Sequence, residues 1–356
     1  MPMSKNLVFA TLALTGCFAG GASADILGAG STAAAPVYRV WAAAYKNATG
    51  AAIKYDAVGS GEGIRRIREG QVDFGASDVP MPEPEAKKAG LVFVPSVVTA
   101  AVPVVNLPAL PPGRLKLTGE LLAGIFQGKL EYWDAPEIRA LNPGVTLPKL
   151  PIRPVVRADG SGTTYHFSDY LSAVSGEWKT AFGARSTLPW PAGFTAVRGS
   201  AEVVKAVQNV AGAIGYVDYN YVLEGNLNAV QLRNAAGRFV SAQVGGFREA
   251  VLHSDWNRKG DFTASLINQP GADTWPITMG TFIAIPAVSK TGTRTLEALK
   301  FITWGYLHGD DLARDAKFVP LPERVQANAY RELARITDVH GAAIGLQSIG
   351  AQAPRQ

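Results

Sequence analysis

Three short turns carry the residues of this sequence whose types and spacing could do chemistry. Residues 28–32 are Gly-Ala-Gly-Ser-Thr, residues 59–63 are Gly-Ser-Gly-Glu-Gly, and residues 157–164 are Arg-Ala-Asp-Gly-Ser-Gly-Thr-Thr. The first backbone N–H groups of a helix lack intrahelical partners and carry the positive end of its dipole, and glycine lets the backbone approach a ligand closely. One such turn is ordinary helix capping, but three turns between expected strands and helices favour a cradle for an oxyanion.

Charged residues stand next to these turns. Arg157 ends an expected strand, and its planar guanidinium suits bidentate contact with a tetraoxyanion. Asp159 could hold that guanidinium in place, or the two residues could form a purely structural ion pair. Asp78 follows Phe-Gly-Ala-Ser at 74–77. A carboxylate beside an anion is unfavourable unless the anion carries a proton, as hydrogen phosphate does and sulfate does not. The alternative role for Asp78 is a helix or turn cap before Pro80.

Familiar catalytic patterns do not fit these turns. A P-loop requires a lysine after its last glycine, and none of the three turns has one. A nucleophile elbow requires glycines two residues before and after the serine, which neither Ser60 nor Ser161 has. The kinase-like Asp-Phe-Gly at 73–75 stands without a catalytic-loop pattern, so we attribute it to chance. A second hypothesis is a phosphatase or esterase that uses Ser161 and His166, although we expect His166 to face solvent or to pack on its own helix.

The composition is that of a globular chain of about two domains. It has 356 residues, of which 47% are apolar and 18% charged, and a formal net charge of +5. No run of basic residues alternates with aromatic ones, so we expect no nucleic-acid partner. Cys17 is the single cysteine, which excludes a disulfide within the chain. The four histidines are widely spaced, so we expect neither a metal site nor a cofactor.

The N-terminus has the pattern of a secretory signal peptide over residues 1–24. Lys5 gives a short positive region, residues 7–14 are apolar, and Ala-Ser-Ala at 22–24 is a small-residue cleavage site. Leu-Thr-Gly-Cys at 14–17 is the alternative, a lipobox in which Cys17 would be acylated. No other apolar run reaches the ~18 residues that a transmembrane helix needs, so we expect a periplasmic protein.

Alternating strand and helix patterns must position the three turns, and they predict an α/β fold with a largely parallel sheet. We expect strands at 25–30, 52–58, 72–76, 91–105 (as two segments), 152–157, 213–219 and 281–285. We expect helices at 36–48, 61–69, 83–89, 118–127, 161–173, 200–210 and 293–307. Ser200 is predicted to cap the helix that follows it. The last ~16 residues, from Gly341, are predicted to form a loose tail.

With these motifs in view, the chain resembles the periplasmic phosphate-binding proteins of ABC-type phosphate importers. The resemblance also rests on residues 72–78, 212–217 and 275–278, and it extends over nearly all of the chain after residue 24. It implies a two-lobed periplasmic-binding-protein fold of type II, with phosphate in the cleft and two chain crossovers, near Asn106 and Thr281. Lobe 1 would comprise residues 25–105 plus 282–356, and lobe 2 residues 106–281.

The resemblance also implies which residues bind phosphate, and how the protein works. The phosphate-binding set is Thr32, Ala33, Ser60, Asp78, Arg157, Ser161, Gly162 and Thr163, with Asp159 orienting Arg157 and Asp78 accepting the phosphate proton. It implies a protein that is not an enzyme, is a monomer when free, binds inorganic phosphate with high affinity in the periplasm and delivers it to the membrane permease subunits of an ABC transporter. A different anion, such as sulfate, molybdate or a phosphonate, is the alternative ligand.

One departure from the family pattern stands at the first turn. The family commonly has Thr-Phe-Pro after the first glycines, whereas this chain has Thr32-Ala33-Ala34. The backbone N–H donor at Ala33 is kept, but the aromatic side chain is lost. We therefore expect a local change of packing beside the cleft.

Overall fold

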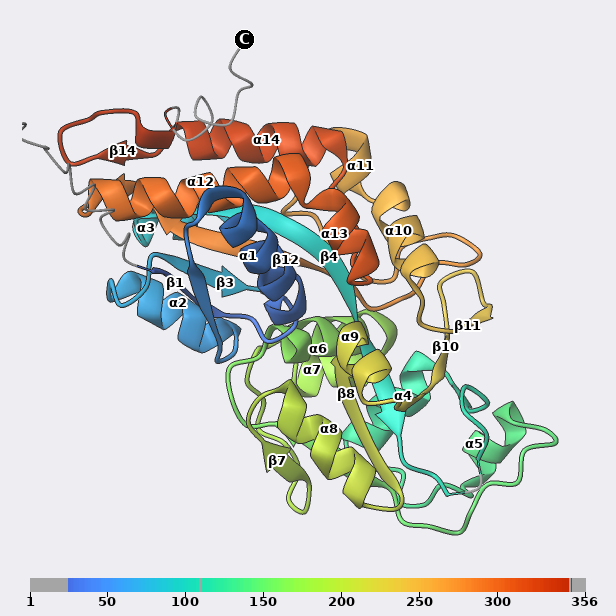
Figure 1. The fold of residues 1–356 in the computed structure, drawn as a ribbon. Coiled ribbons are helices and arrows are strands. Elements are labelled where there is room, and N and C mark those ends of the chain that lie inside the picture. The colour runs from blue at the N-terminus through green and yellow to red at the C-terminus, as the bar shows by residue number, and fades with distance from the viewer. Residues whose placement is uncertain (1–24, 109, 346, 348–356) are drawn as a thin grey trace, which may run out of the picture.

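The computed structural model describes residues 25–108, 110–345 and 347. Its main sheet has the strand order β2-β1-β3-β12-β4-β8-β6-β7, with β9 pairing against β4. Figure 1 shows an upper and a lower body, with β4 running from one into the other. Parallel pairs lie at both ends of the sheet, whereas β3, β12, β4 and β8 pair antiparallel at its centre. The fold is therefore two-lobed and mixed α/β, and the sheet is less parallel than the sequence predicts.

Strands and helices alternate in the first part of the chain, at one end of the sheet. In α1, Val37, Trp41 and Tyr45 share one buried face, and the helix ends at Gly50, whose φ of 80° suits glycine. These spans agree with the predicted ones within about two residues. The elements are β1 (Ile26–Gly30), α1 (Ala35–Thr49), β2 (Ile53–Ala57), α2 (Ser60–Arg68), β3 (Phe74–Ser77) and α3 (Glu83–Lys88).

A single long strand, β4 (Leu91–Val105), connects the two bodies. The prediction of two segments is wrong, because β4 changes partners without interrupting its extended backbone. Residues 91–100 pair with β12 (Thr278–Pro286) on one side, and residues 101–105 pair with β8 (Ala213–Asp218) on the other. Almost every side chain of β4 is buried, which is the environment that a continuous Val- and Ala-rich run favours.

The lower body contains the middle of the chain. Its part of the main sheet is β8 between β4 and β6, with β7 at the edge, and a small sheet of order β11-β10-β5 lies beside it. The further elements are β5 (Lys116–Leu117), α4 (Gly119–Phe126), α5 (Pro136–Leu141), β6 (Arg153–Arg157), α6 (Gly162–Val174), α7 (Gly176–Ala181), β7 (Thr195–Val197), α8 (Ser200–Asn209), α9 (Tyr219–Glu224), β9 (Asn228–Ala229), β10 (Gln231–Arg233) and β11 (Phe239–Val240).

The C-terminal part of the chain returns to the upper body. β12 lies between β3 and β4, and the Arg294 guanidinium of α12 donates to the Asp73 carboxylate at 2.6 and 2.8 Å. That ion pair gives Asp73 a structural role, in keeping with a chance Asp-Phe-Gly. The elements are α10 (Val244–His253), α11 (Asp255–Lys259), β13 (Val288–Ser289), α12 (Gly292–His308), α13 (Asp310–Asp315), α14 (Glu323–Ala334) and β14 (Thr337–Asp338).

The sequence predicts a signal peptide at the start of the chain and a loose tail at its end. The signal peptide at 1–24 and the alternative lipidation of Cys17 lie outside the described residues. The loose tail predicted from Gly341 is wrong for its first residues, because Ile344 is buried and the Gly345 N–H donates to the Ile336 carbonyl at 3.0 Å. A buried side chain and a backbone hydrogen bond therefore hold this short segment close to the end of α14.

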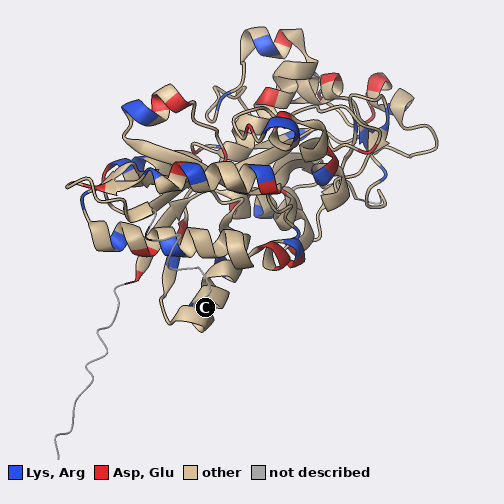
Figure 2. Ribbon diagram, turned by 90° about the horizontal axis from the view of Figure 1, so that it is seen from above, with Lys and Arg blue, Asp and Glu red and all other residues tan. Residues whose placement is uncertain are grey.

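Charges of both signs are interspersed over the surface seen from above in Figure 2. Many form pairs one helical turn apart, such as Arg65 with Glu62 and Arg335 with Glu332, which is typical of solvated helix faces.

In the described part of the chain, no helix combines the length and the apolar character needed to cross a membrane. Residues 25–108, 110–345 and 347 also contain no cluster of three or more His, Cys, Asp or Glu side chains suited to a metal ion.

Gly63 gives a test of how closely α2 packs on the sheet. A Cβ at this position would lie 2.4 Å from the Gly30 Cα and 2.7 Å from the Ala29 carbonyl oxygen, both of them backbone atoms of β1. We expect Gly63→Ala to lower the free energy of unfolding by about 1–3 kcal/mol, measured by urea titration. Gly245→Ala at the start of α10 is the control, because a Cβ there meets nothing within 4 Å. Equal midpoints for the two variants would contradict this packing.

Candidate ligand-binding site

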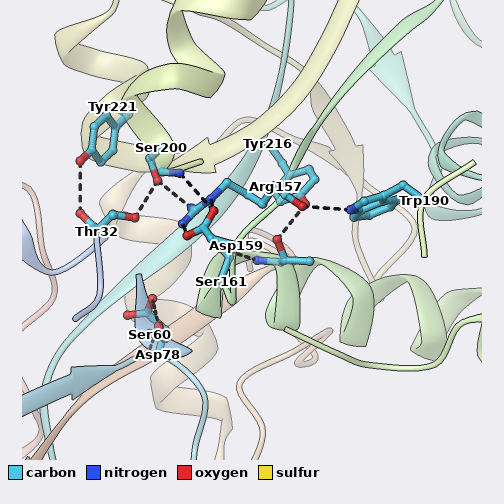
Figure 3. A network of polar contacts seen from close by, with 12 residues as sticks. Thr32, Ser60, Asp78, Arg157, Asp159, Ser161, Trp190, Ser200, Tyr216 and Tyr221 are labelled. Carbon is cyan, nitrogen blue, oxygen red and sulfur yellow. Dashed lines mark hydrogen bonds and ion pairs between the residues drawn. The ribbon is translucent and has the colours of Figure 1, made fainter. Parts of the chain in front are cut away.

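The three glycine-containing turns meet in the structure. The Gly61 N–H of the second turn donates to the Gly160 carbonyl of the third at 3.0 Å, and the Gly59 N–H of the second turn donates to the Gly30 carbonyl of the first at 2.8 Å. Every residue predicted for the site is buried, and no side chain among them is more than 7% exposed. The sequence therefore predicts correctly which segments come together (Figure 3).

The first turn, between β1 and α1, is shaped by Gly30. Its φ is 144°, and a Cβ would lie 2.0 Å from the Ala76 carbonyl oxygen, so only glycine fits. The Ser31 hydroxyl donates to the Asp78 carboxylate at 2.6 Å and accepts from the Ala34 N–H at 3.1 Å. Ala33 is fully buried within the apolar core. The turn thus buries small side chains where the family pattern has an aromatic ring, and the α1 N-terminus follows directly.

Asp78, at the end of β3, lies at the centre of a hydrogen-bond network. Its carboxylate accepts from the Ser31 hydroxyl and, at 3.3 Å, from the Ser60 hydroxyl, while its own N–H donates to the Ser60 oxygen at 3.1 Å. Burial raises the pKa of Asp78 to about 6, although both hydroxyls and Arg157 oppose that rise. The alternative role as a turn cap is filled by Ser77, whose hydroxyl oxygen accepts the Val79 N–H at 3.0 Å.

His166 is not where the sequence predicts it. Its ring is buried, and Nε2 lies 2.6 Å from the Asp78 carbonyl oxygen, so it spans from α6 to the end of β3 instead of facing solvent or its own helix. Burial lowers its pKa to about 4, which keeps the ring neutral at neutral pH. The Ser161 hydroxyl oxygen accepts the Thr164 N–H at 3.1 Å. The serine and histidine of the enzyme hypothesis therefore have separate partners.

The N-terminus of α6 lies directly against Asp78. A Cβ on Gly162 would come 2.4 Å from the Asp78 Cβ and 2.7 Å from the Ser60 Oγ, so glycine is required for this approach. The next residue, Thr163, has a buried hydroxyl that finds no hydrogen-bond partner in the described part of the chain. Buried hydroxyls usually have hydrogen-bond partners. A ligand atom at the first turn of α6 would supply the partner that the Thr163 hydroxyl lacks.

Arg157 and Asp159 form a buried ion pair. Arg157 Nε and Nη2 donate to the two carboxylate oxygens of Asp159 at 2.7 and 2.5 Å. Burial raises the pKa of Asp159, but the Arg157 guanidinium outweighs it, so the net shift is downward. The Trp190 indole N–H donates to the Arg157 carbonyl at 3.2 Å and fixes the end of β6 (Figure 3). The guanidinium is therefore held on one edge by Asp159, a contact that fits both the orienting role and the purely structural ion pair that the sequence leaves open.

Ser200 belongs to this cluster and is not a helix cap, which corrects the prediction. α8 begins at Ser200 itself, and Gly199 precedes it with a φ of 77°. The Gly199 N–H donates to Asp159 at 3.1 Å, which turns the Ser200 hydroxyl toward Arg157 Nη1 at 3.2 Å and Thr32 at 2.8 Å. Gly-Ser before a helix repeats the pattern at 59–60, so this signal was present in the sequence.

No sequence pattern predicts that Tyr221 belongs to the site, although its hydroxyl reaches the first turn. Its hydroxyl, on α9, donates to the Thr32 carbonyl at 3.3 Å. A tyrosine on a short helix remote in sequence cannot be assigned to a turn from local pattern alone. Together, Ser200 and Tyr221 bring two groups of the lower body onto the first turn, which belongs to the upper body (Figure 3).

Comparisons with known proteins find relatives over most of the chain. A family model described as a PBP superfamily domain matches residues 19–291. The phosphate-binding protein PstS of Xylella fastidiosa is 41% identical over 310 residues, which cover 86% of this chain and 85% of that protein. The phosphate-binding protein PstS of Haemophilus influenzae is 39% identical over 301 residues, which cover 85% and 90%.

A similarity to solved structures supports the fold. A high-affinity periplasmic phosphate-binding protein, solved with bound phosphate, has a TM-score of 0.68 to this chain and covers 86% of it, with 93% of its own chain aligned. Its sequence identity is 22%, so the likeness concerns the arrangement of helices and strands.

Removing Asp159 tests the buried ion pair. Asp159→Ala leaves the Arg157 guanidinium buried without its carboxylate, and breaking a buried pair on one side typically costs about 3–5 kcal/mol. We expect a loss of that size in the free energy of unfolding, measured by denaturant titration. Asp311→Ala is the control, since Asp311 pairs with Arg314 on the surface and such pairs contribute ~0–1 kcal/mol. A similar, small effect of both substitutions would mean that the Arg157 charge is not buried.

Proposed function

This chain belongs to the PBP superfamily and to the family of the phosphate-binding proteins PstS, and on that premise we propose that it binds inorganic phosphate between its two lobes and delivers it to the permease of an ABC-type importer. The observation that carries the proposal is the convergence of three helix N-termini and one anchored arginine on the buried Asp78 carboxyl. Helix N-termini supply N–H donors and positive potential for an anion, and the carboxyl supplies one acceptor.

The proposed ligand set is the one that the sequence resemblance implies. Thr32 and Ser60 contribute hydroxyl and backbone N–H donors, and Ala33 contributes its N–H. From the other side, Ser161, Gly162 and Thr163 contribute the first turn of α6, whose N–H groups have no intrahelical partners. Arg157 uses three of its five N–H donors on Asp159 and Ser200, so donors on Nη1 and Nη2 remain for phosphate oxygens.

Asp78 supplies the selectivity in this proposal. With a pKa of about 6, its carboxyl is ionised at neutral pH and accepts the proton of hydrogen phosphate. Sulfate has no proton there, so one of its anionic oxygens would face a buried carboxylate. The alternative anion sulfate is therefore disfavoured, and a site of this kind rejects analogues that lack the paired hydrogen by ~10⁴–10⁵.

Delivery of phosphate requires closure and release. The upper body contributes Thr32, Ala33, Ser60 and Asp78, and the lower body contributes the groups from Arg157 to Thr163 (Figure 1). Phosphate bridging the two sets would favour a closed arrangement through hinge motion. The protein would act without catalysis, as a periplasmic monomer whose partners are phosphate and the membrane subunits of the transporter.

Calorimetric titration with inorganic phosphate tests the function directly. We expect the wild-type protein to bind one phosphate, and Arg157→Ala to weaken binding at least ~10-fold, because a charge-assisted hydrogen bond in a buried site contributes ~1.5–3 kcal/mol. Arg238→Ala is the control, since Arg238 pairs with Asp273 on the surface. No heat of binding by the wild-type protein would refute phosphate binding, and an unchanged dissociation constant for Arg157→Ala would remove Arg157 from the site.

Competition by sulfate tests the role of Asp78. Asp78→Asn removes the repulsion and offers a donor amide, so excess sulfate should displace labelled phosphate from this variant and not from the wild type at pH 8. Because the pKa of Asp78 is about 6, lowering the pH to 5 protonates the wild-type carboxyl, and its discrimination should fall toward that of the variant. Asp56→Asn, at an exposed carboxylate of the same lobe, is the control. Equal discrimination by wild type and Asp78→Asn would exclude Asp78 as the proton acceptor.

A further inference from the structure

A buried carboxyl lies at the point where β4 passes from one body to the other. Ala100 is the last residue of β4 that pairs with β12, and Ala101 is the first that pairs with β8, opposite Asp218. The Thr99 hydroxyl donates to Asp218 Oδ2 at 2.6 Å, and both side chains are completely buried. One hydrogen bond therefore joins the β12-paired part of β4 to the end of β8.

The other oxygen of the same carboxyl organises α9. Asp218 Oδ1 accepts the Asn220 backbone N–H at 3.0 Å, which caps this short helix. α9 carries Tyr221, whose hydroxyl donates to the Thr32 carbonyl in the first turn of the site. A continuous series of contacts thus runs from Thr99 through Asp218 and α9 to Thr32.

The surroundings make this carboxyl dependent on its two donors. Thr99 and Asn220 are both neutral, and burial raises the pKa of Asp218 to about 7, with the Asp78 carboxyl at the end of β3 adding to the rise. Among the described residues, the Tyr221 phenol on α9 also faces this carboxyl. A buried carboxyl that loses one of its donors is strongly destabilised where it stands, so Thr99 holds Asp218, and with it α9, in position.

We propose that Asp218 is a positioning residue that slows the release of bound ligand. Thr99 holds Asp218 on the strand that joins the lobes, and Asp218 in turn positions the N-terminus of α9. Tyr221 on α9 then bonds to the Thr32 turn in the closed protein. The inference rests on the proposed phosphate binding. Its consequence is specific. Tyr221 and Thr32 lie on opposite bodies and are joined here by a hydrogen bond that separation of the bodies would break, so weakening the series of contacts speeds the escape of bound phosphate and leaves capture by the open protein nearly unchanged.

The test measures binding and release separately. Dissociation constants come from calorimetry with inorganic phosphate, and release rates come from chasing labelled phosphate with an excess of unlabelled phosphate. We expect Thr99→Val to speed release about tenfold, the effect of losing one strong hydrogen bond, with the association rate changed less than about threefold. Thr99→Ser retains the hydroxyl and should restore slow release. Thr303→Val is the matched control, since the Thr303 hydroxyl is buried but bonds within α12.

A double-mutant cycle identifies the route. Tyr221→Phe removes the hydroxyl that reaches Thr32, and Tyr221→Phe combined with Thr99→Val should release phosphate no faster than the quicker single variant, because both changes break one series of contacts. Wild-type release rates in Thr99→Val, no rescue by Thr99→Ser, or additive effects in the cycle would each overturn the inference while phosphate binding stands. Failure of the wild-type protein to bind phosphate would instead refute the proposed function, and this inference with it.

Discussion

The two bodies meet at the site through glycine backbone, and this contact limits everything else there. Gly162 has room for no side chain against Asp78 and Ser60, and a Cβ on Gly59 would lie 2.6 Å from the Asp159 carboxylate. Gly61 and Gly160 join the facing turns by a backbone hydrogen bond. Helix N-terminal N–H groups act only at short range, so they can converge on one small ligand only if no side chains keep the turns apart.

Such close contact buries charge, and the structure accommodates each charge differently. Arg157 and Asp159 neutralise each other through two hydrogen bonds, whereas Asp78 has hydroxyl donors and a pKa raised to about 6 by burial. His166 adds no charge at neutral pH, because burial holds its pKa near 4. The site therefore presents one arginine already paired with Asp159, one proton acceptor and otherwise neutral dipoles, which is a charge pattern suited to an anion that brings its own proton.

Local pattern predicts the three turns and the contact of Arg157 with Asp159, because these depend on neighbouring residues. The role of Asp78 comes instead from the chemistry of hydrogen phosphate and from the family resemblance, since its partners Ser31 and Ser60 lie 47 and 18 residues away. Most of the misses are long-range. Ser200 turns inward because Gly199 bonds to Asp159, forty residues earlier in the chain, and His166 reaches a carbonyl in another strand. β4 is continuous because it pairs with β12 over residues 91–100 and with β8 over residues 101–105. Tyr221 and Asp218 are positioned by tertiary contacts, which local sequence patterns do not predict.

The same topology also fixes the point where β4 passes from one body to the other. Ala101, where β4 changes partner, donates its N–H to the Ile277 carbonyl at 3.0 Å, and its carbonyl accepts the Trp275 indole N–H at 3.0 Å. The outgoing and returning strands are thus fixed side by side at one point. Each half of the site is held by its own part of the sheet, Asp78 by β3 and Arg157 by β6. A ligand that bonds to both halves would therefore oppose, through every contact it makes, any movement that separates the turns at Gly162 and Ser60.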